Sequence, residues 1–149
     1  MTNNEFDDIR RVSTLPYNWG KLDNKVLLIS GGTGFIGSFL CDVIRYRNRY
    51  YGQNTKVISV ACRQFENDET VTYLSRDIRE PITIEEDVDF IIHLASNTHP
   101  EQYKVDPVGT ITGNVFGTYN LLNLALVKHS SRFVFASSCE IYGDGREKP

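Results

Sequence analysis

The chain has few cysteines and no long apolar run, and both absences narrow the class of protein it can be. Its three cysteines, Cys41, Cys62 and Cys139, are widely spaced and form no C-x-x-C pair. This pattern supports neither disulfides nor a metal site, and it favours a reducing cytoplasm. The longest apolar runs fall far short of the ~20 residues that span a bilayer. The first eight residues lack the basic start and apolar centre of a signal peptide. No membrane association is therefore expected.

A strong charge of one sign is absent as well. The 16 Lys and Arg residues against 19 Asp and Glu residues give a formal net charge of −3 at pH 7. Nucleic-acid binding through bulk positive charge is therefore not expected. With 40% hydrophobic and 23% charged residues, the 149-residue chain has the composition of one ordinary globular domain.

Short apolar runs alternate with longer segments along the chain. The predicted strands are residues 26–30, 57–61, 71–75, 90–94 and 133–137. Most of these runs are apolar on both faces, which is typical of parallel strands covered by helices on two sides. An apolar stripe at helical spacing begins at Phe35, and a second helix is predicted from about Pro107 to Lys128, with proline in its first turn. The pattern predicts an α/β fold with a doubly wound parallel sheet, a Rossmann fold, over residues 25–149.

Other segments depart from this alternation. Residues 63–70 and 78–88 are too short for the dozen or more residues that a parallel crossover usually takes, so irregular crossovers are expected. Residues 1–24 form an N-terminal extension that contains the single tryptophan, Trp19, and we expect it to pack against the domain. The basic and aromatic residues between 45 and 51 predict a solvated helix end, placed favourably against the helix dipole.

The segment SGGTGFIG follows the first predicted strand directly and opens the first predicted helix. Gly31 permits a tight turn, Gly34 lets the backbone approach a pyrophosphate, and Gly37 lets the helix pack closely on the strand. The helix start, at Phe35 and Ile36, presents free N–H groups to the anion. No Lys follows where a P-loop carries one, so the motif predicts a dinucleotide site.

The end of the second predicted strand bears on which dinucleotide is bound. A Rossmann site places Asp or Glu there to hold the adenosine ribose, or a basic residue where a 2′-phosphate must be neutralised. The strand ends Ala61-Cys62-Arg63, so the cofactor is predicted to be NAD or NADP, with Arg63 slightly favouring NADP. Glu66, Asp68 and Glu69 lie nearby, which leaves open that one of them supplies the acid.

Taken with the glycine-rich turn, four further segments resemble the extended short-chain dehydrogenases that act on nucleotide sugars. In the family's order they are LSRDI from Leu74, DFIIHLAS from Asp89, NVFGTYNLL from Asn114 and SSCEIYG from Ser137. The resemblance is strongest toward UDP-glucuronate decarboxylases and dTDP-glucose 4,6-dehydratases. It implies an NAD(P)-dependent epimerase, dehydratase or decarboxylase that works through a transient 4-keto sugar.

The resemblance also implies roles for single residues. Those expected to touch the cofactor are Asp77 and Ile78 at the adenine, and Leu94, Ala95 and Ser96 between adenosine and nicotinamide. Asn120 is expected to face the nucleotide-sugar substrate. His93 is expected to be packed and hydrogen-bonded within its strand.

The chemistry is expected after the fifth strand. The resemblance implies that Ser138 hydrogen-bonds the sugar 4-hydroxyl and that Glu140 serves as an acid or base. Cys139 replaces the acid that protonates the leaving hydroxyl in dTDP-glucose dehydratases, and a thiol does this poorly, so decarboxylation or epimerisation is favoured over elimination. We expect Cys139 itself to be a small buried packing residue.

The family's central acid/base is a Tyr with a Lys four residues later, and Tyr142 has Arg146 at that spacing. We therefore expect the chain to be an N-terminal portion, ending before the substrate-binding segment and inactive by itself. A non-catalytic dinucleotide-sensing or scaffold protein on the same fold remains the alternative. The resemblance also makes a homodimer possible, because family members commonly pair through helices of this domain.

Overall fold

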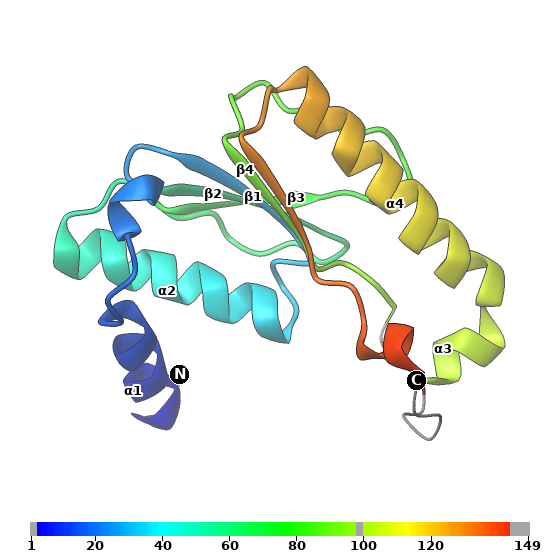
Figure 1. Ribbon diagram of the computed structural model, residues 1–149, viewed down its shortest axis with the longest axis horizontal. Helices are drawn as coiled ribbons and strands as arrows, with labels where there is room; N and C mark the ends of the chain where they lie inside the picture. Colours follow the sequence, from blue (N-terminus) through cyan, green and yellow to red (C-terminus); the bar gives the residue numbers. More distant parts are fainter. Residues whose placement is uncertain (1–2, 98–99, 144–149) are drawn as a thin grey trace.

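The computed structural model describes residues 3–97 and 100–143 and shows a five-stranded sheet with helices on both faces (Figure 1). The helices are α1 (Asn3–Ser13), α2 (Phe35–Tyr51), α3 (Pro100–Val105) and α4 (Pro107–Val127), with 3-10 turns η1 (Trp19–Leu22) and η2 (Cys139–Tyr142). The strands are β1 (Val26–Ser30), β2 (Lys56–Ala61), β3 (Val71–Ser75), β4 (Phe90–His93) and β5 (Arg132–Phe135).

The strand order is β3-β2-β1-β4-β5, and all four neighbouring pairs are parallel. This is the doubly wound order, so the predicted fold class is confirmed. The order reverses between β1 and β4, whose last residues, Ser30 and His93, are register partners. β1 and β3 have the predicted bounds, and those of β2, β4 and β5 differ from the prediction by one or two residues. β5 ends at Phe135, shortly before Ser137, whose φ of 60° leaves the extended region.

Both faces of the sheet are covered at β1, β2 and β4, as the apolar strands predict, whereas β5, at the end of the strand order, is mostly exposed. On one face Leu27, Ile29 and Val57 pack with Cys41 and Ile44 of α2. On the other face, the core contains the following residues of β1, β2, β4 and α4: Leu28, Ile58, Val60, Ile91, Leu121 and Leu124. Figure 1 shows α2 and α4 on opposite sides of the sheet. Burying one such Leu or Ile side chain contributes about 1.5–3 kcal/mol.

Local chemistry fixes where the two long helices begin and end. α2 starts after Gly34 and stops at Gly52, whose φ of 63° lies in the left-handed region that favours glycine. α4 is capped by Asp106, whose Oδ1 accepts the Gly109 N–H at 2.8 Å. Pro107 occupies the first turn, as predicted.

The two short crossovers contain no helix, as expected, and the N-terminal extension packs against α2. Ile9 of α1 is buried, and the ring of Phe6 lies 5.8 Å from that of Tyr46. Arg47 donates to the Ser13 carbonyl at 3.0 Å and lies 4.8 Å from the Trp19 ring. The prediction of a solvated helix end at 45–51 is therefore confirmed only for Arg49, Tyr50 and Tyr51, which are exposed. The extension packs on Tyr46 and Arg47 through contacts that no local pattern in the sequence reports.

Candidate functional site

The glycine-rich turn joins β1 to α2 beside the end of β4, at the point where the strand order reverses. We call this region, residues 30–37 and 94–96, the switch-point edge. Doubly wound folds bind their ligands outside the carboxyl ends of the strands at this point. The turn is closed by the Gly34 N–H, which donates to the Gly31 carbonyl at 2.9 Å.

The turn leaves no room for side chains at two of its glycines. Gly31 has a φ of 76°, and a Cβ there would lie 2.9 Å from the Ala95 nitrogen. A Cβ at Gly37 would lie 2.6 Å from the Gly32 Cα. The backbone therefore approaches any ligand directly, and the first N–H groups of α2 have no intrahelical partner. This geometry fits the pyrophosphate of a dinucleotide.

Phe35 and Ile36 stand at the start of α2 with their side chains outward. Their exposed fractions are 94% and 58%. The side chains therefore take no part in the core, and the N–H groups of this first turn are the groups that the structure offers to an anion.

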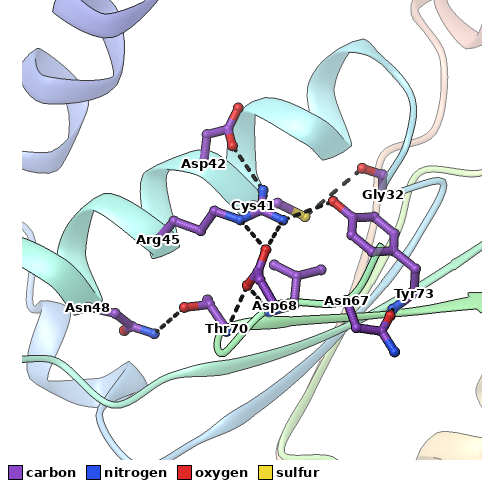
Figure 2. A network of polar contacts seen from close by, with 10 residues as sticks. Gly32, Cys41, Asp42, Arg45, Asn48, Asn67, Asp68, Thr70 and Tyr73 are labelled. Carbon is purple, nitrogen blue, oxygen red and sulfur yellow. Dashed lines mark hydrogen bonds and ion pairs between the residues drawn. The ribbon is translucent and has the colours of Figure 1, made fainter. Parts of the chain in front are cut away.

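Arg63 follows β2 at the same edge of the sheet and is exposed. Of the three nearby acids, Asp68 is already engaged, as Figure 2 shows: its Oδ2 accepts two hydrogen bonds from Arg45, Nε at 2.8 Å and Nη2 at 2.6 Å. Its Oδ1 accepts the backbone N–H groups of Thr70 and Val71, both at 2.8 Å. Asp68 thus holds the start of β3 against α2.

These contacts also set the protonation of Asp68. Burial by itself would raise its pKa, but the hydrogen bonds from Arg45 and from the Val71 and Thr70 N–H groups outweigh burial and lower the pKa below 3.8. Asp68 is therefore charged at neutral pH and committed to Arg45 and the backbone. Glu69 lies just before β3 and borders Val26 and Lys56 at the amino ends of the strands, so it lies away from the switch-point edge.

Asp77 and Ile78 follow β3, and the side chain of Ile78 packs against α4. Arg79 donates through Nε to the Asp77 carboxylate at 2.8 Å, and this bond, with that from the Arg79 N–H, lowers the pKa of Asp77. The Ile78 side chain fills the space at Gly117, where a Cβ would lie 2.8 Å from Ile78 Cγ1.

Asn120 lies on α4, but its amide is used inside the protein. Its Nδ2 donates to the carbonyls of Ile78, at 2.9 Å, and Arg79, at 2.8 Å. The side chain therefore ties α4 to the segment after β3. The structure gives Asn120 this positioning role, and the expected contact with a sugar stays a prediction.

Leu94, Ala95 and Ser96 lie at the switch-point edge, beside the glycine turn. The N–H groups of Leu94 and Ala95 donate to Ser30 Oγ at 3.2 and 3.3 Å. Ser96 Oγ donates to Asn114 Oδ1 of α4 at 2.8 Å. The segment is thus held from both sides, by β1 and by α4.

Ser138 follows β5 at the same edge and is exposed. Glu140 falls within η2, and its side chain lies outside the described residues. Cys139 is exposed, so the expectation of a buried packing residue is wrong. β5 is the edge strand here, and no described element covers the segment after it.

A Tyr-x-x-x-Lys spacing does occur once, at Tyr17 and Lys21, ahead of β1. Tyr17 is 66% exposed and packs edge-on against Trp19, 6.1 Å between ring centroids. Trp19 in turn stacks on Arg47, which is about 18 Å along α2 from its first residue at 1.5 Å per residue. The pair therefore belongs to the extension and not to the switch-point edge.

The buried polar residues of the site were only partly foreseen. His93 is 1% exposed and hydrogen-bonded, as expected. Its partners Ser30 and Thr118 were missed. The only signal in the sequence is a serine that ends an otherwise apolar strand, because β1 and α4 meet His93 only in the folded chain.

Among the residues that the structure describes, no group of three or more His, Cys, Asp or Glu side chains could hold a metal ion. None of the helices described at residues 3–97 and 100–143 has the length and apolar character needed to cross a membrane.

A parallel β3-β2-β1-β4-β5 sheet with a glycine cradle at its reversal point defines a dinucleotide-binding Rossmann domain. The chain belongs to the NAD dependent epimerase/dehydratase family, which residues 27–149 match. The resemblance noted in the sequence is therefore confirmed.

Among curated relatives, the chain is similar to UDP-glucuronic acid decarboxylase 1 of Arabidopsis thaliana, at 35% identity over 93% of this chain and 32% of that protein. It is 38% identical to UDP-glucuronic acid decarboxylase 4 of the same plant, over 86% of this chain and 29% of that protein. UDP-glucuronic acid decarboxylase 1 of Danio rerio is 35% identical, over 85% of this chain and 30% of that protein. The chain thus spans about a third of the length of these relatives.

Solved structures agree on the fold. A UDP-galactose 4-epimerase superposes with a TM-score of 0.67 at 27% identity, covering 82% of this chain and 41% of that one. An NAD-dependent NDP-hexosamine 5,6-dehydratase, TunA, involved in tunicamycin biosynthesis, gives 0.64 at 26% identity, covering 85% and 41%.

Proposed function

We propose that this chain is the dinucleotide-binding portion of a nucleotide-sugar epimerase, dehydratase or decarboxylase that works through a transient 4-keto sugar. The observation that carries the proposal is the glycine cradle at the switch-point edge, where Gly31 and Gly37 admit no side chain. The similarity to UDP-glucuronic acid decarboxylases supports the substrate class. When bound, the nicotinamide would take a hydride from sugar C4 and return it.

The chain's own residues would bind and orient. The first N–H groups of α2 would hold the pyrophosphate, Asp77 and Ile78 the adenine, and Leu94 to Ser96 the middle of the cofactor. Ser138 would hydrogen-bond the sugar 4-hydroxyl, and Glu140 would move a proton near the sugar. Turnover would require the Tyr-Lys pair from further sequence, so this chain alone is expected to bind cofactor without catalysing the reaction.

Binding is tested by titration calorimetry of the 149-residue chain with NAD and NADP. We expect saturable binding, lost in Gly37→Ala because its Cβ would press on Gly32. Gly113→Ala is the matched control, since a Cβ at Gly113 meets nothing within 4 Å. Failure of the parent chain to bind either dinucleotide would overturn the proposal. Steady conversion of UDP-glucuronic acid by this chain alone would refute its expected inactivity.

A preference for NADP over NAD is part of the proposal. It is supported by exposed Arg63 after β2 and by the commitment of Asp68 to Arg45. Arg63→Met should weaken NADP binding about tenfold, as loss of one ionic hydrogen bond would, and leave NAD binding unchanged. Arg132→Met makes the same charge change at the start of β5, the opposite edge of the sheet, and should alter neither. Tighter binding of NAD than of NADP would reject the preference.

We also propose that the chain pairs as a homodimer through the outer face of α4. The face carries exposed Val108, Ile111, Val115 and Leu122 at helical spacing. Light scattering should show a mass that rises with concentration, and Val115→Glu should abolish the rise. Asn123→Glu, an equal charge change on the same helix, should not. A monomer at all concentrations would exclude this pairing.

A further inference from the structure

Ser30, His93 and Thr118 form a continuous chain of hydrogen bonds beneath the switch-point edge. Ser30 Oγ lies 2.7 Å from His93 Nδ1, and His93 Nε2 lies 3.1 Å from Thr118 Oγ1. Thr118 Oγ1 donates to the Asn114 carbonyl at 2.6 Å. These hydrogen bonds, which we call the relay, therefore link the last residues of β1 and β4 to the middle of α4.

The direction of each hydrogen bond follows from the two ends. A carbonyl oxygen only accepts, so the Thr118 hydroxyl donates to Asn114 and must accept from His93 Nε2–H. At the other end, Ser30 Oγ accepts the N–H groups of Leu94 and Ala95. The Ser30 hydroxyl proton is therefore free to point at His93 Nδ1, so Ser30 Oγ donates a hydrogen bond and Nδ1 accepts it. The arrangement is satisfied by one species, the neutral imidazole protonated at Nε2.

The relay also sets the position of the segment that borders the cofactor site. Ser30 directly precedes Gly31, and the Ala95 nitrogen would lie 2.9 Å from a Cβ at Gly31. The glycine turn thus lies directly against Ala95, whose N–H donates to Ser30 Oγ. At the far end, Asn114 accepts through Oδ1 from Ser96. Both borders of the switch-point edge are fixed by groups that the relay joins.

We infer that Ser30, His93 and Thr118 are a positioning relay, and that neutral His93 holds the switch-point edge in the shape that binds the dinucleotide. The inference rests on the proposed function for its ligand. His93 is a positioning residue because it acts through Ser30 and Thr118 and not through contact with the cofactor.

Protonation of His93 would disrupt the relay. An imidazolium donates from both nitrogens, so Nδ1–H would face Ser30 Oγ, which already accepts two N–H groups and would have to turn its own proton elsewhere. The other groups described against the ring are Thr118 of α4 and the aromatic rings of Phe133 and Phe135 of β5, none of them charged at neutral pH. Burial lowers the pKa of His93, which keeps it neutral at pH 7.

The test measures NAD affinity by calorimetry between pH 7.5 and 5.5, a range in which the pyrophosphate keeps its charge. The dissociation constant of the parent chain should rise as the pH falls through the pKa of His93, which burial places below its usual range. His93→Gln, which does not titrate, should bind more weakly at pH 7.5 and give a flat profile. His129→Asn, at an exposed position with a φ of 52°, removes another imidazole and should keep the parent profile.

A second pair of variants covers the case in which His93→Gln fails to fold. Thr118→Val removes the acceptor for Nε2–H and should weaken NAD binding, whereas Thr118→Ser keeps the hydroxyl and should restore it. Equal affinity in the valine and serine variants would overturn the inference. So would a pH profile of His93→Gln that matches the parent.

Nitrogen-15 NMR of the free protein separates this inference from the proposed function. It should find His93 as the Nε2–H tautomer, with the Leu94 and Ala95 amide shifts following its titration. If NAD and NADP both fail to bind, the proposed function falls, and the NMR result still decides whether the relay exists. An Nδ1–H tautomer, or amide shifts that do not follow the imidazole, would overturn the relay.

Discussion

Arg45 and Asp68, 23 residues apart, are joined by two hydrogen bonds that connect α2 to the loop before β3. The guanidinium also donates to Asp42 at 2.9 Å and to the Tyr73 hydroxyl at 3.1 Å. This network substitutes for the helix that a β2–β3 crossover usually supplies, because it fixes an irregular loop to the layer beneath it (Figure 2).

Asp68→Asn should lower the free energy of unfolding by about 1–2 kcal/mol at pH 7, since the amide cannot pair with Arg45 and the partly exposed position screens the loss. Glu69→Gln removes the same charge from an adjacent exposed residue and should have little effect. Because folding lowers the pKa of Asp68 from 3.8, its contribution is complete above that pH and is lost as the pH falls below it. Urea titrations from pH 7 to pH 3 should show the stabilities of the parent chain and of Asp68→Asn converging. A difference between them that stays constant with pH would argue against the ion pair.

Gly113 and Gly117 occupy successive turns of α4 but differ in their surroundings. Gly113→Ala should raise stability by about 0.5–1 kcal/mol, because alanine favours a helix and the position is open. Gly117→Ala should be at least about 1 kcal/mol less stable than Gly113→Ala, since its Cβ displaces Ile78. Thermal unfolding measures both changes. Weaker NAD binding in Gly117→Ala alone would support a place for Ile78 in the adenine site, and equal stabilities would contradict the close packing.

Removing the hydroxyl group should have opposite effects on stability at two buried serines. Ser59 Oγ is the one buried side-chain polar atom within the described part of the chain that has no hydrogen-bond partner. Ser59→Ala should therefore leave stability unchanged or raise it by up to about 1 kcal/mol. Ser30→Ala, in the neighbouring strand, should lower the free energy of unfolding by about 1–3 kcal/mol, because it leaves His93 Nδ1 and the Ala95 N–H without their hydrogen-bond partner. Similar losses in both variants would show that Ser59 has an unrecognised partner.

The three cysteines should react with thiol reagents at different rates. Cys41 is fully buried, and burial raises its pKa to about 11, whereas Cys62 and Cys139 are exposed. Because the thiolate is the reactive form, a disulfide reagent at pH 8 should modify two thiols quickly and the third only after unfolding. Cys62→Ser and Cys139→Ser should each remove one fast equivalent, whereas Cys41→Ser should remove none. Three fast thiols in the native chain would contradict the burial of Cys41.

The sequence by itself determined the fold and the location of the glycine turn. Strands buried on both faces must be apolar throughout, and a glycine turn between strand and helix is local in the chain, so both leave a pattern in consecutive residues. Pro107 and its helix were predictable for the same reason.

Tertiary structure alone decided which polar groups meet. Arg45 reaches Asp68 across 23 residues, and Ser30 reaches His93 across 63. The Asn120 amide donates to the carbonyls of Ile78 and Arg79, which lie 42 and 41 residues away in the sequence. The extension likewise covers Arg47 through contacts between separate helices. Hydrogen bonds of this kind depend on the register of strands and the docking of helices, which the order of residues along one segment does not record.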